Sequence, residues 1–517
     1  MARFKEYSYS QGVFKTIFFE KQILPGTFEY TLNYLIDNEV DLSVFRERYK
    51  NDKTGAKAYD PAILLKIVLY AYSKGIVSSR KIAQCCKENV IFMALSADTC
   101  PHFTTIADFI SSLDKEAVHL FRDILLVCDR MGLIGKEMFA IDGCKLPSNA
   151  SKEWSGTRAD FKKKAAKMEK AIANILKKHR EHDEAKSDSE IKVKEKKYVE
   201  TLKKRVKKIK EWLDNNDDKI GKSGKPIKSN ITDNESAKMK TSKGVIQGYN
   251  GVTVVDGRHQ VIVHAESFGQ SNEQDLLKPM IDGVRANFRA LNNKGDVFRK
   301  AKLLADSGFY SKKNMELLFE EGIDGYVADP HFRKRDPRFA DIDRYKERSR
   351  KERAKREGRK KLFGVSDFFF PDDLSYCICP AGKRLYRSGG NVISKGEFRS
   401  VRFKGPKSAC LPCNLRSQCL RHPDRTEIRQ VAYFLGKTEK SKDSLAEKMK
   451  RKIDSAAGRM LYGMRLAIAE PPFAHLRSVL GLDRFTLRGR KKVNIQWNLF
   501  CLIHNMKKIH VYGAGFA

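Results

Sequence analysis

The stretch MFAIDGCKL, residues 138–146, decides the fold that we predict for this chain. It is a short apolar run that carries one acid, Asp142, and such a run is typical of a buried β-strand that delivers a carboxylate to an edge of the fold. The segment KLLADSGFYS, residues 302–311, repeats the pattern with Asp306. A turn and a helix closed by Gly322 follow the second acid. The sequence therefore predicts two strand-borne carboxylates.

Four further segments complete the predicted core, three strands and one helix: GVIQGYNGVTVVD (244–256), HQVIVHAESF (259–268), a helix at 272–288 and DGYVAD (324–329). The first two strands are rich in Val and Ile and are joined near Gly257, so we expect them to be adjacent. We expect the resulting sheet to place Asp142 and Asp306 on neighbouring strands.

A third acid, Glu470, lies on a predicted helix late in the chain. Pro471 and Pro472 follow it directly, and proline removes a helical hydrogen bond and clashes with the preceding turn. We therefore expect the helix to break or restart there, with the prolines in a first turn. If this junction points Glu470 away from the two aspartates, Asp483 is the substitute acid.

Three such carboxylates suit magnesium or manganese, because these hard cations prefer oxygen ligands. Two ions about 4 Å apart can activate the attacking oxygen and stabilise the leaving oxygen of a phosphoryl displacement.

These motifs, in order from about Ala58 to the C-terminus, resemble those of bacterial insertion-sequence transposases of the DDE type, whose last acid lies in a Tyr-Arg-Glu-Lys signature. The matching residues are Asp142, Asp306, Tyr462, Arg465 and Glu470, with Arg477 in the place of the signature's Lys. The resemblance implies an α/β fold with a ribonuclease H-like mixed sheet, helices on both faces, and two Mg²⁺ or Mn²⁺ ions held by the three acids. Tyr462, Arg465 and Arg477 would position DNA phosphates.

The same resemblance implies the partners. They are double-stranded DNA, namely the terminal inverted repeats of the element and the target DNA, and further copies of the chain in a homodimer or larger assembly on that DNA.

Composition favours a nucleic-acid partner. Lysine and arginine total 101 against 64 acids, a net charge of +37, which attracts polyanions, although anionic membrane surfaces would be attracted as well. No long uncharged apolar run or signal peptide is visible, so we expect a cytoplasmic, nucleoid-associated protein with no membrane partner. The 11 cysteines fit reduced thiols or a metal site better than a disulfide framework.

Residues 1–130 predict a helical DNA-binding or assembly domain, ahead of a catalytic domain at 131–517. Asp60 and Pro61 begin a helix and Ser78 caps the next one. The short break between them fits a helix-turn-helix, and an all-helical packing domain fits equally well.

A helix-turn-helix would place Arg80 and Lys81 near the duplex. A third helix is expected over residues 104–128.

Two insertions interrupt the predicted catalytic domain. In the first, 158–228, apolar residues recur at steps of three and four, the pattern of a coiled-coil hairpin with its bend at AKSDSE (185–190). This hairpin is either a basic arm or dimerisation element, or two helices with solvated lysine faces.

The second insertion, 331–450, begins with a basic run and continues into a cysteine cluster. The preferred ligands for a zinc ion are Cys379, Cys410, Cys413 and Cys419, with Cys377 or His422 as replacements. Cysteines that bind no metal are the alternative.

Five cations crowd the segment after the acidic helix: Arg484, Arg488, Arg490, Lys491 and Lys492. Together they would neutralise phosphates of the element end. The last helix, 493–509, carries an apolar stripe and is expected to pack on the core, with Trp497 buried rather than stacked on a base.

The predicted function is metal-dependent cleavage of element ends followed by strand transfer into target DNA. A hydrolytic DNA nuclease without strand transfer is one alternative. A DNA-binding regulator with a degenerate metal site is another, and the retention of all three acids argues against it.

Overall fold

The computed structural model describes residues 16–49, 57–182, 189–221, 224–242, 244–339, 362–394, 398–437 and 444–515. The described residues form two compact units, the first within Met1–Phe309, Ile323–Gly325 and Gly463–Ala517, and the second within Tyr310–Gly322 and Tyr326–Tyr462. Most of the predicted bend at 185–190, and the part of the predicted basic run at 340–361, lie outside the described residues.

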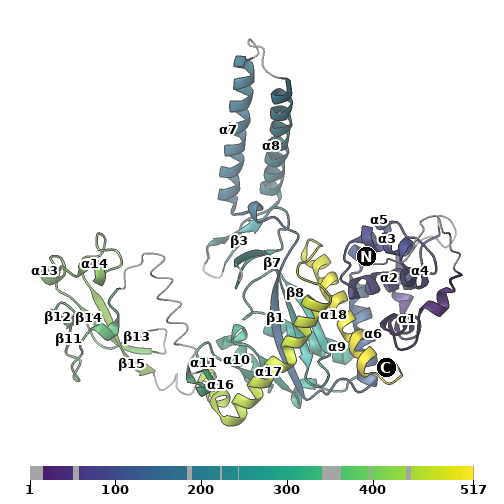
Figure 1. The fold of residues 1–517 in the computed structure, drawn as a ribbon. Helices are drawn as coiled ribbons and strands as arrows, with labels where there is room; N and C mark the ends of the chain where they lie inside the picture. Colours follow the sequence, from purple (N-terminus) through teal and green to yellow (C-terminus); the bar gives the residue numbers. More distant parts are fainter. Residues whose placement is uncertain are drawn as a thin grey trace, which may run out of the picture. The chain divides into compact units, whose positions relative to one another are not determined.

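The first unit is built around a six-stranded mixed sheet (Figure 1). Its strand order is β10-β9-β1-β7-β6, and β8 also pairs with β7. The strands are β1 (Met138–Pro147), β6 (Ala237–Thr241), β7 (Gly244–Asp256), β8 (Ile262–Phe268), β9 (Lys302–Ala305) and β10 (Asp324–Val327). The strand β7 coincides with the segment predicted from its Val and Ile content.

Strand direction changes at β1, which pairs antiparallel with β7 and parallel with β9. The parallel pairing runs from Met138 opposite Lys302 to Ile141 opposite Ala305. Asp142 is the next residue on β1, and Asp306 directly follows β9. The expected placement of these two acids on neighbouring strands is therefore confirmed.

Helices cover the sheet from both sides. The helix α9 (Leu277–Ala290) packs on β8 and β7, and α18 (Arg490–Tyr512) packs on β8. An added Cβ on Gly251 of β7 would meet the Trp497 ring of α18, whereas one on Gly283 of α9 would meet His264 of β8. His264 is the register partner of Val254. Because side chains alternate along a strand, Gly251 and Val254 face opposite sides, and so do the two helices.

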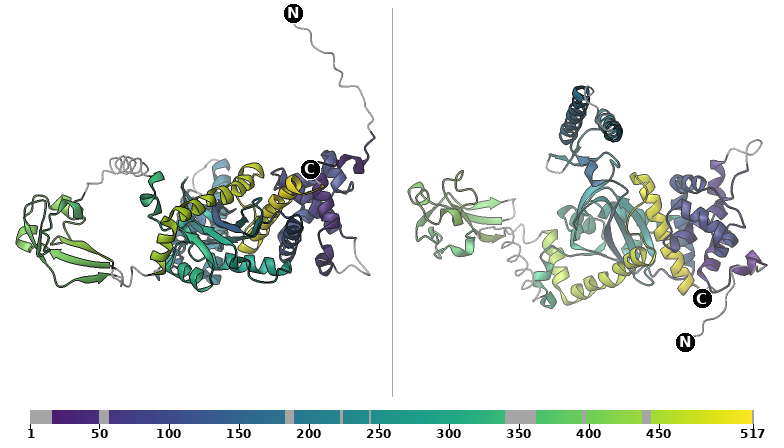
Figure 2. Two further views of the ribbon diagram at one scale, coloured as in Figure 1. Left: turned by 90° about the horizontal axis from the view of Figure 1, so that it is seen from below. Right: turned by 45° about the horizontal axis from the view of Figure 1, so that its top comes forward.

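The N-terminal region is helical, as predicted. It contains α1 (Phe28–Asn38), α2 (Pro61–Ser73), α3 (Ser79–Glu88), α4 (Val90–Leu95), α5 (Phe103–Ser112) and α6 (Lys115–Arg130), with 3-10 turns at Phe19–Gln22 and Leu42–Arg48. The helix α18 packs against α1, α2, α5 and α6, so it links this region to the sheet (Figure 2, right). The side chain of Asp60 caps α2 by accepting from the Ala62 amide at 2.8 Å, whereas that of Ser78 makes no capping bond to α3.

The predicted single helix over 104–128 is wrong. The chain leaves helical geometry at Leu113, where ψ is 71°, and α6 starts at Lys115. Just before the break, the Ser112 hydroxyl donates to the Asp108 carbonyl at 2.6 Å, and such local bonding competes with continuation of a helix.

Two long helices, α7 (Arg158–His182) and α8 (Ser189–Asn215), lie side by side in the region where a helical hairpin was expected (Figures 1 and 2). Near its base, Phe161, Ala165, Ile209 and Trp212 form a small core. Short strand pairs flank the hairpin: β2 (Ser155–Gly156) with β5 (Ser229–Asn230), and β3 (Lys219–Ile220) with β4 (Pro226–Ile227).

The expected break at Pro471 and Pro472 is wrong as well. The helix α17 (Ala456–Ala474) runs through both prolines and then widens into a π-helix, His475–Val479. Pro471 has no N–H to donate to the Ala467 carbonyl, and the Gln260 side chain donates to that carbonyl instead, at 3.0 Å. A group from a distant part of the chain thus compensates for the missing helical bond.

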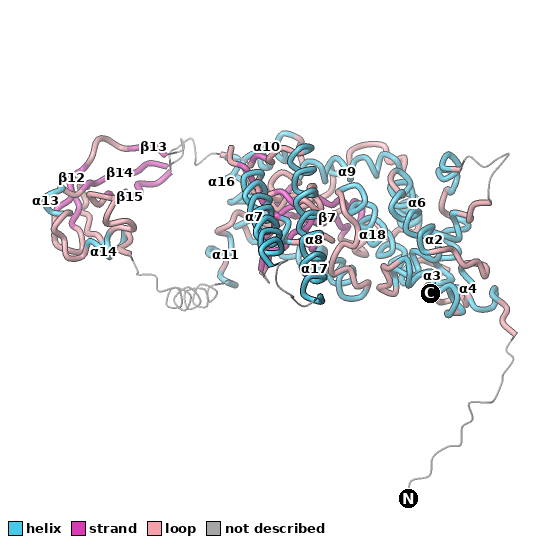
Figure 3. Tube along the Cα trace, turned by 90° about the horizontal axis from the view of Figure 1, so that it is seen from above, coloured by secondary structure: helices cyan, strands magenta, loops and turns pink. Residues whose placement is uncertain are grey.

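The second unit contains a separate five-stranded sheet of order β11-β12-β14-β13, with β15 paired to β14. Its strands are β11 (Tyr376–Ile378), β12 (Arg384–Arg387), β13 (Val392–Ser394), β14 (Phe398–Lys404) and β15 (Gln430–Lys437). Figure 3 distinguishes these strands from the two short helices beside them, α13 (Lys407–Cys410) and α14 (Arg416–Cys419). The unit also holds α10 (Lys312–Glu320), α11 (Phe332–Arg335) and α16 (Leu445–Asp454).

The described chain is therefore mixed α/β with a helical N-terminal region. Among the described residues, no helix is both long enough and apolar enough to cross a membrane.

Candidate active site

Asp142 lies on β1 against a buried arginine. Its Oδ2 accepts a hydrogen bond from Arg465 Nη1 at 2.6 Å, and its Oδ1 accepts from the Gly143 amide at 2.7 Å. The pKa of Asp142 is raised to about 6: burial is the largest cause, the Arg465 guanidinium opposes it, and the nearby charges of Asp306 and Glu273 add to it. The acid thus lies in a setting that disfavours its charge unless a cation is close.

Asp306 follows β9 directly, and its Oδ1 accepts from the Gly308 amide at 2.6 Å. The 3-10 turn Ser307–Phe309 holds this bond. A Cβ on Gly308 would meet the carboxylate oxygens Glu273 Oε2 and Asp306 Oδ1. Glycine at this position therefore lets both carboxylates lie against the turn without moving.

Glu273 is an acid that the sequence did not single out. Burial raises its pKa, Lys145 lowers it, and the charge of Asp306 raises it. Its Oε1 lies 3.7 Å from Lys145 Nζ and accepts from Asn250 Nδ2 at 3.1 Å. Glu273 precedes α9 in a polar segment that carries no apolar pattern, so the one available signal was its own charge.

Glu470 projects into a cavity beside the strand of Asp142. Gly143 and Cys144 line this cavity together with Glu470, Arg477 and Asp483. Cys144 is two residues beyond Asp142 on β1, so their side chains face the same side of the sheet. Glu470, which is exposed, therefore lies on the side to which Asp142 points. Lys145, the partner of Glu273, faces the other side.

The four acids of this region do not all lie equally close to one another. Asp142, Asp306 and Glu273 are near enough to shift one another's charge. Across the described residues, however, no group of three or more histidine, cysteine, aspartate or glutamate side chains is arranged to hold a metal ion. Asp142 and Asp306 supply the oxygen donors that divalent cations prefer, but among the described residues Glu470 does not form a metal-binding group with them.

The predicted DNA-contacting residues have varied surroundings. Arg477 is exposed in the π-helix, and Arg465 is buried against Asp142. Tyr462 stacks edge-on against Phe332, with ring centroids 5.0 Å apart.

The basic segment after the π-helix is exposed but partly engaged. Arg484 and Arg488 donate to the carbonyls of Ser148 and Asn149. Arg490 Nη2 lies 2.7 Å from Glu266 Oε1 and Lys491 Nζ 2.6 Å from Asp114 Oδ2. Lys492 is exposed.

Arg80 and Lys81 are exposed at the start of α3, and the Arg80 guanidinium lies 4.9 Å from the centroid of the Phe103 ring. The expected burial of Trp497 is confirmed: its ring is inaccessible to solvent and Nε1 donates to the Val252 carbonyl.

Two segments of the chain match known protein families. Residues 378–510 match the family described as transposase DDE domain, and residues 18–112 match a transposase domain of the DUF772 family. The first match contains Arg465, Glu470 and Arg477, whereas Asp142 and Asp306 lie outside both. No curated protein matches the chain. The DDE-domain match indicates an enzyme of the nuclease and transposase type, and the two matches together support an insertion-sequence transposase.

Proposed function

We propose that this protein cuts the ends of an insertion sequence and joins them to target DNA by successive phosphoryl transfers. Asp142, Asp306 and Glu470 would be its catalytic acids, on a ribonuclease H-like core. The observation that carries this proposal is the position of Asp142 and Asp306, side by side where the parallel pairing of β1 and β9 ends.

The strand order supports the fold part of the proposal. Reading β8-β7-β1-β9-β10, the first three strands are antiparallel neighbours and β9 is parallel to β1. The helix α9 lies between β8 and β9 in the chain, and α10 lies between β9 and β10. Parallel neighbours need such crossovers, and ligand sites in sheets with this connectivity gather at the carboxyl ends of parallel strands. Asp306 is at that end of β9.

The three acids would hold two Mg²⁺ or Mn²⁺ ions, with the aspartates shared and Glu470 completing one coordination sphere. Bound there, divalent cations would activate the attacking oxygen and stabilise the leaving oxygen. Glu470 is the exposed acid of the three, so it would reach the cluster from the cavity that it lines with Gly143 and Cys144.

Other side chains would position the reactants. Arg465 fixes the carboxylate plane of Asp142 through its 2.6 Å bond, and Glu273 pairs with Lys145 and is close enough to Asp306 for that charge to raise the pKa of Glu273. Arg477 is the exposed cation on the Glu470 cavity, so it would contact a backbone phosphate of the DNA strand that enters there.

DNA binding would be dominated by phosphates and sensitive to salt, because the chain carries a net charge of +37. The segment with Arg484, Arg488 and Lys492 would bind the part of the terminal inverted repeat that lies next to the cavity. If α2 and α3 act as a helix-turn-helix, Arg80 and Lys81 would bind another part of the same repeat. Cleavage of two ends in one event requires at least a dimer on DNA.

A joining assay separates this function from a plain nuclease. The substrate is a DNA end from the flank of this gene, already cut to a 3′-hydroxyl, mixed with plasmid target and Mg²⁺. Products in which the end is covalently joined to plasmid support a transposase. Plasmid nicking without joined product would support the nuclease instead, and binding without either reaction would support a regulator.

A further inference from the structure

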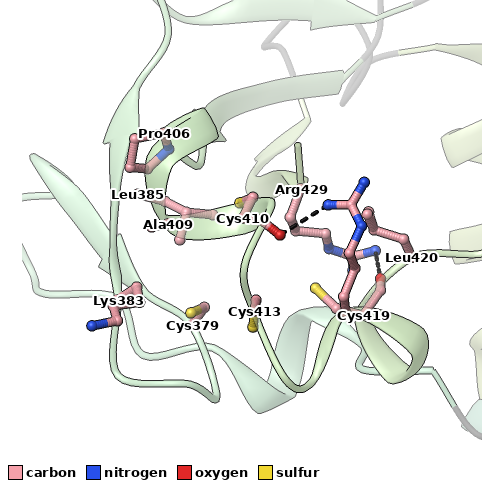
Figure 4. Close-up of a pocket in the computed structure, with 11 residues that line it drawn as sticks. Cys379, Lys383, Leu385, Pro406, Ala409, Cys410, Cys413, Cys419, Leu420 and Arg429 are labelled. Atoms are coloured by element: carbon pink, nitrogen blue, oxygen red, sulfur yellow. Dashed lines mark hydrogen bonds between the residues drawn. The ribbon is translucent and has the colours of Figure 1, made fainter. Parts of the chain in front are cut away.

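Four cysteines line one cavity in the second unit (Figure 4). They are Cys379, Cys410, Cys413 and Cys419. The four come from segments up to 40 positions apart in the sequence, yet they line the same cavity.

Local backbone structure presents each sulfur to the cavity. Cys379 begins a tight turn in which its carbonyl accepts from the Gly382 amide at 2.8 Å, and Gly382 has a φ of 70°. Cys410 ends α13 and Cys419 ends α14. Cys413 begins the turn between these helices, and its carbonyl accepts from the Arg416 amide at 3.0 Å.

The segment that carries three of these cysteines has almost no core of its own. Within the described residues 406–429, Leu420 alone is buried. The hydrophobic core of this part of the chain is formed by the sheet and by Phe368. A chain segment that buries so little apolar surface needs another source of order, such as a metal ion.

Two arginines already tie this segment together. Arg416 donates to four carbonyls, those of Cys410, Pro423, Thr426 and Glu427, at 2.7–2.9 Å. Arg429 donates to the Cys419 carbonyl at 2.9 Å. Arg416 and Arg429 are also among the residues that line the cavity, whereas the Lys383 ammonium points away from the cysteines (Figure 4). The two arginines would partly offset a negatively charged centre.

We propose that Cys379, Cys410, Cys413 and Cys419 bind one zinc ion that holds residues 406–429 in place. On binding, each thiol would lose its proton to solvent and each thiolate would donate an electron pair to zinc, with no change in oxidation state. Four thiolates and Zn²⁺ carry a net charge of −2, which Arg416 and Arg429 would offset. Tetrahedral thiolate zinc has sulfurs about 3.8 Å apart. Because the described cysteines are not arranged to hold a metal ion, their side chains would have to turn toward a common centre on binding.

The two other candidate ligands do not reach this cavity. Cys377 is fully buried in the hydrophobic core beside Phe368 and Val401. His422 is exposed and is not among the residues that line the cavity.

Zinc content and thiol chemistry of the full-length protein test the proposal. Protein purified without chelator should contain one zinc ion per chain, and a mercurial thiol reagent should release it. The double variant Cys410→Ser/Cys413→Ser should lose the zinc. Cys100→Ser, which removes an exposed cysteine of the helical region, should retain it, and so should Asp306→Asn, which alters the other metal site.

Cobalt provides a readout that does not depend on folding yield. Reconstitution of the wild-type protein with Co²⁺ should give the intense visible and thiolate-to-metal bands of a tetrahedral four-sulfur site. Zinc-free protein whose cysteines are all reduced and fail to bind Co²⁺ would overturn the proposal. Zinc that stays bound in the double variant, or that leaves with Asp306→Asn, would overturn it as well.

Discussion

Arg465 Nη1 donates to Asp142 Oδ2 at 2.6 Å, so the first strand-borne acid is neutralised by an arginine of the helix that carries the third acid. The ion pair is mostly buried, with 9% of the Arg465 side chain and 20% of the Asp142 side chain exposed. It links α17 to β1 and fixes where Glu470, five residues further on, enters the site.

Arg465→Ala should lower the free energy of unfolding by about 3 kcal/mol, because it leaves a buried carboxylate without its partner. Chemical denaturation followed by circular dichroism measures this loss. Arg477→Ala removes an exposed cation nearby and should change stability little. The double variant Arg465→Ala/Asp142→Asn should recover part of the loss; a double variant as unstable as the single one would show that the pair is not the cause.

Gly251→Ala should destabilise the packing of α18 on the sheet. The new Cβ would lie 2.9 Å from Cζ2 of the fully buried Trp497 ring, and overpacking of this kind costs roughly 1–3 kcal/mol. Thermal unfolding of the variant should show the loss, and Trp497→Phe in the same chain should reduce it because the smaller ring leaves room. Gly390→Ala, where a Cβ meets nothing within 4 Å, is the matched control.

A buried histidine pair should make stability fall in mild acid. His504 Nδ1 lies 3.0 Å from His475 Nδ1, and His504 Nε2 lies 2.9 Å from the Gln260 carbonyl. The pKa of His504 is lowered to about 3 and that of His475 to about 4, mainly by burial, with the charge of Lys508 adding to both shifts. In the unfolded chain both would titrate near 6.5.

Between pH 6.5 and 4 the unfolded chain therefore binds protons that the folded chain does not, and stability decreases as the pH falls. The pair should account for roughly 2 kcal/mol of this decrease, after allowance for the partial exposure of His475. Unfolding measured across this range should show a shallower decline for His475→Asn than for the wild type. Parallel curves would contradict the assignment.

Gly405→Ala should weaken zinc binding without removing a thiol. An added Cβ would lie 2.5 Å from Cys410 Sγ, so the sulfur must move away from its neighbours. Competition with a chromogenic chelator should give a zinc affinity about tenfold or more below that of the wild type, since displaced ligands bind metal less tightly. Gly390→Ala, in the same sheet region, should match the wild type. Equal affinities for all three proteins would argue against Cys410 as a ligand.

The strands of the core were predictable because their signal is local. Residues 244–256 are dense in Val and Ile, and the observed strand β7 has those bounds. The break between α5 and α6 was missed because no glycine or proline marks it in the sequence; the Ser112 hydroxyl donates to the Asp108 carbonyl just before it. The continuity of α17 through Pro471 was missed because Gln260, more than 200 residues earlier, replaces the lost hydrogen bond.

For the site, the adjacency of Asp142 and Asp306 followed from the strand pattern, because each acid ends an apolar run. The side chains that contact these two acids in the folded protein could not be predicted from the sequence. Glu273 lies in a polar segment and reaches Asp306 only through the fold, and Arg465 pairs with Asp142 across 323 positions. Neither contact leaves a periodic signature in the sequence.

Cleavage of end-containing DNA by Asp306→Asn tests the central claim most directly. The substrate is a duplex from the flank of this gene, incubated with Mg²⁺ and either the wild type, Asp306→Asn, or Asp483→Asn, which alters an exposed acid on the Glu470 cavity. We predict that the wild type and Asp483→Asn cut and join the end, and that Asp306→Asn loses both steps by roughly a hundredfold or more while still binding the DNA. Cleavage and joining by Asp306→Asn at the wild-type rate would contradict the account.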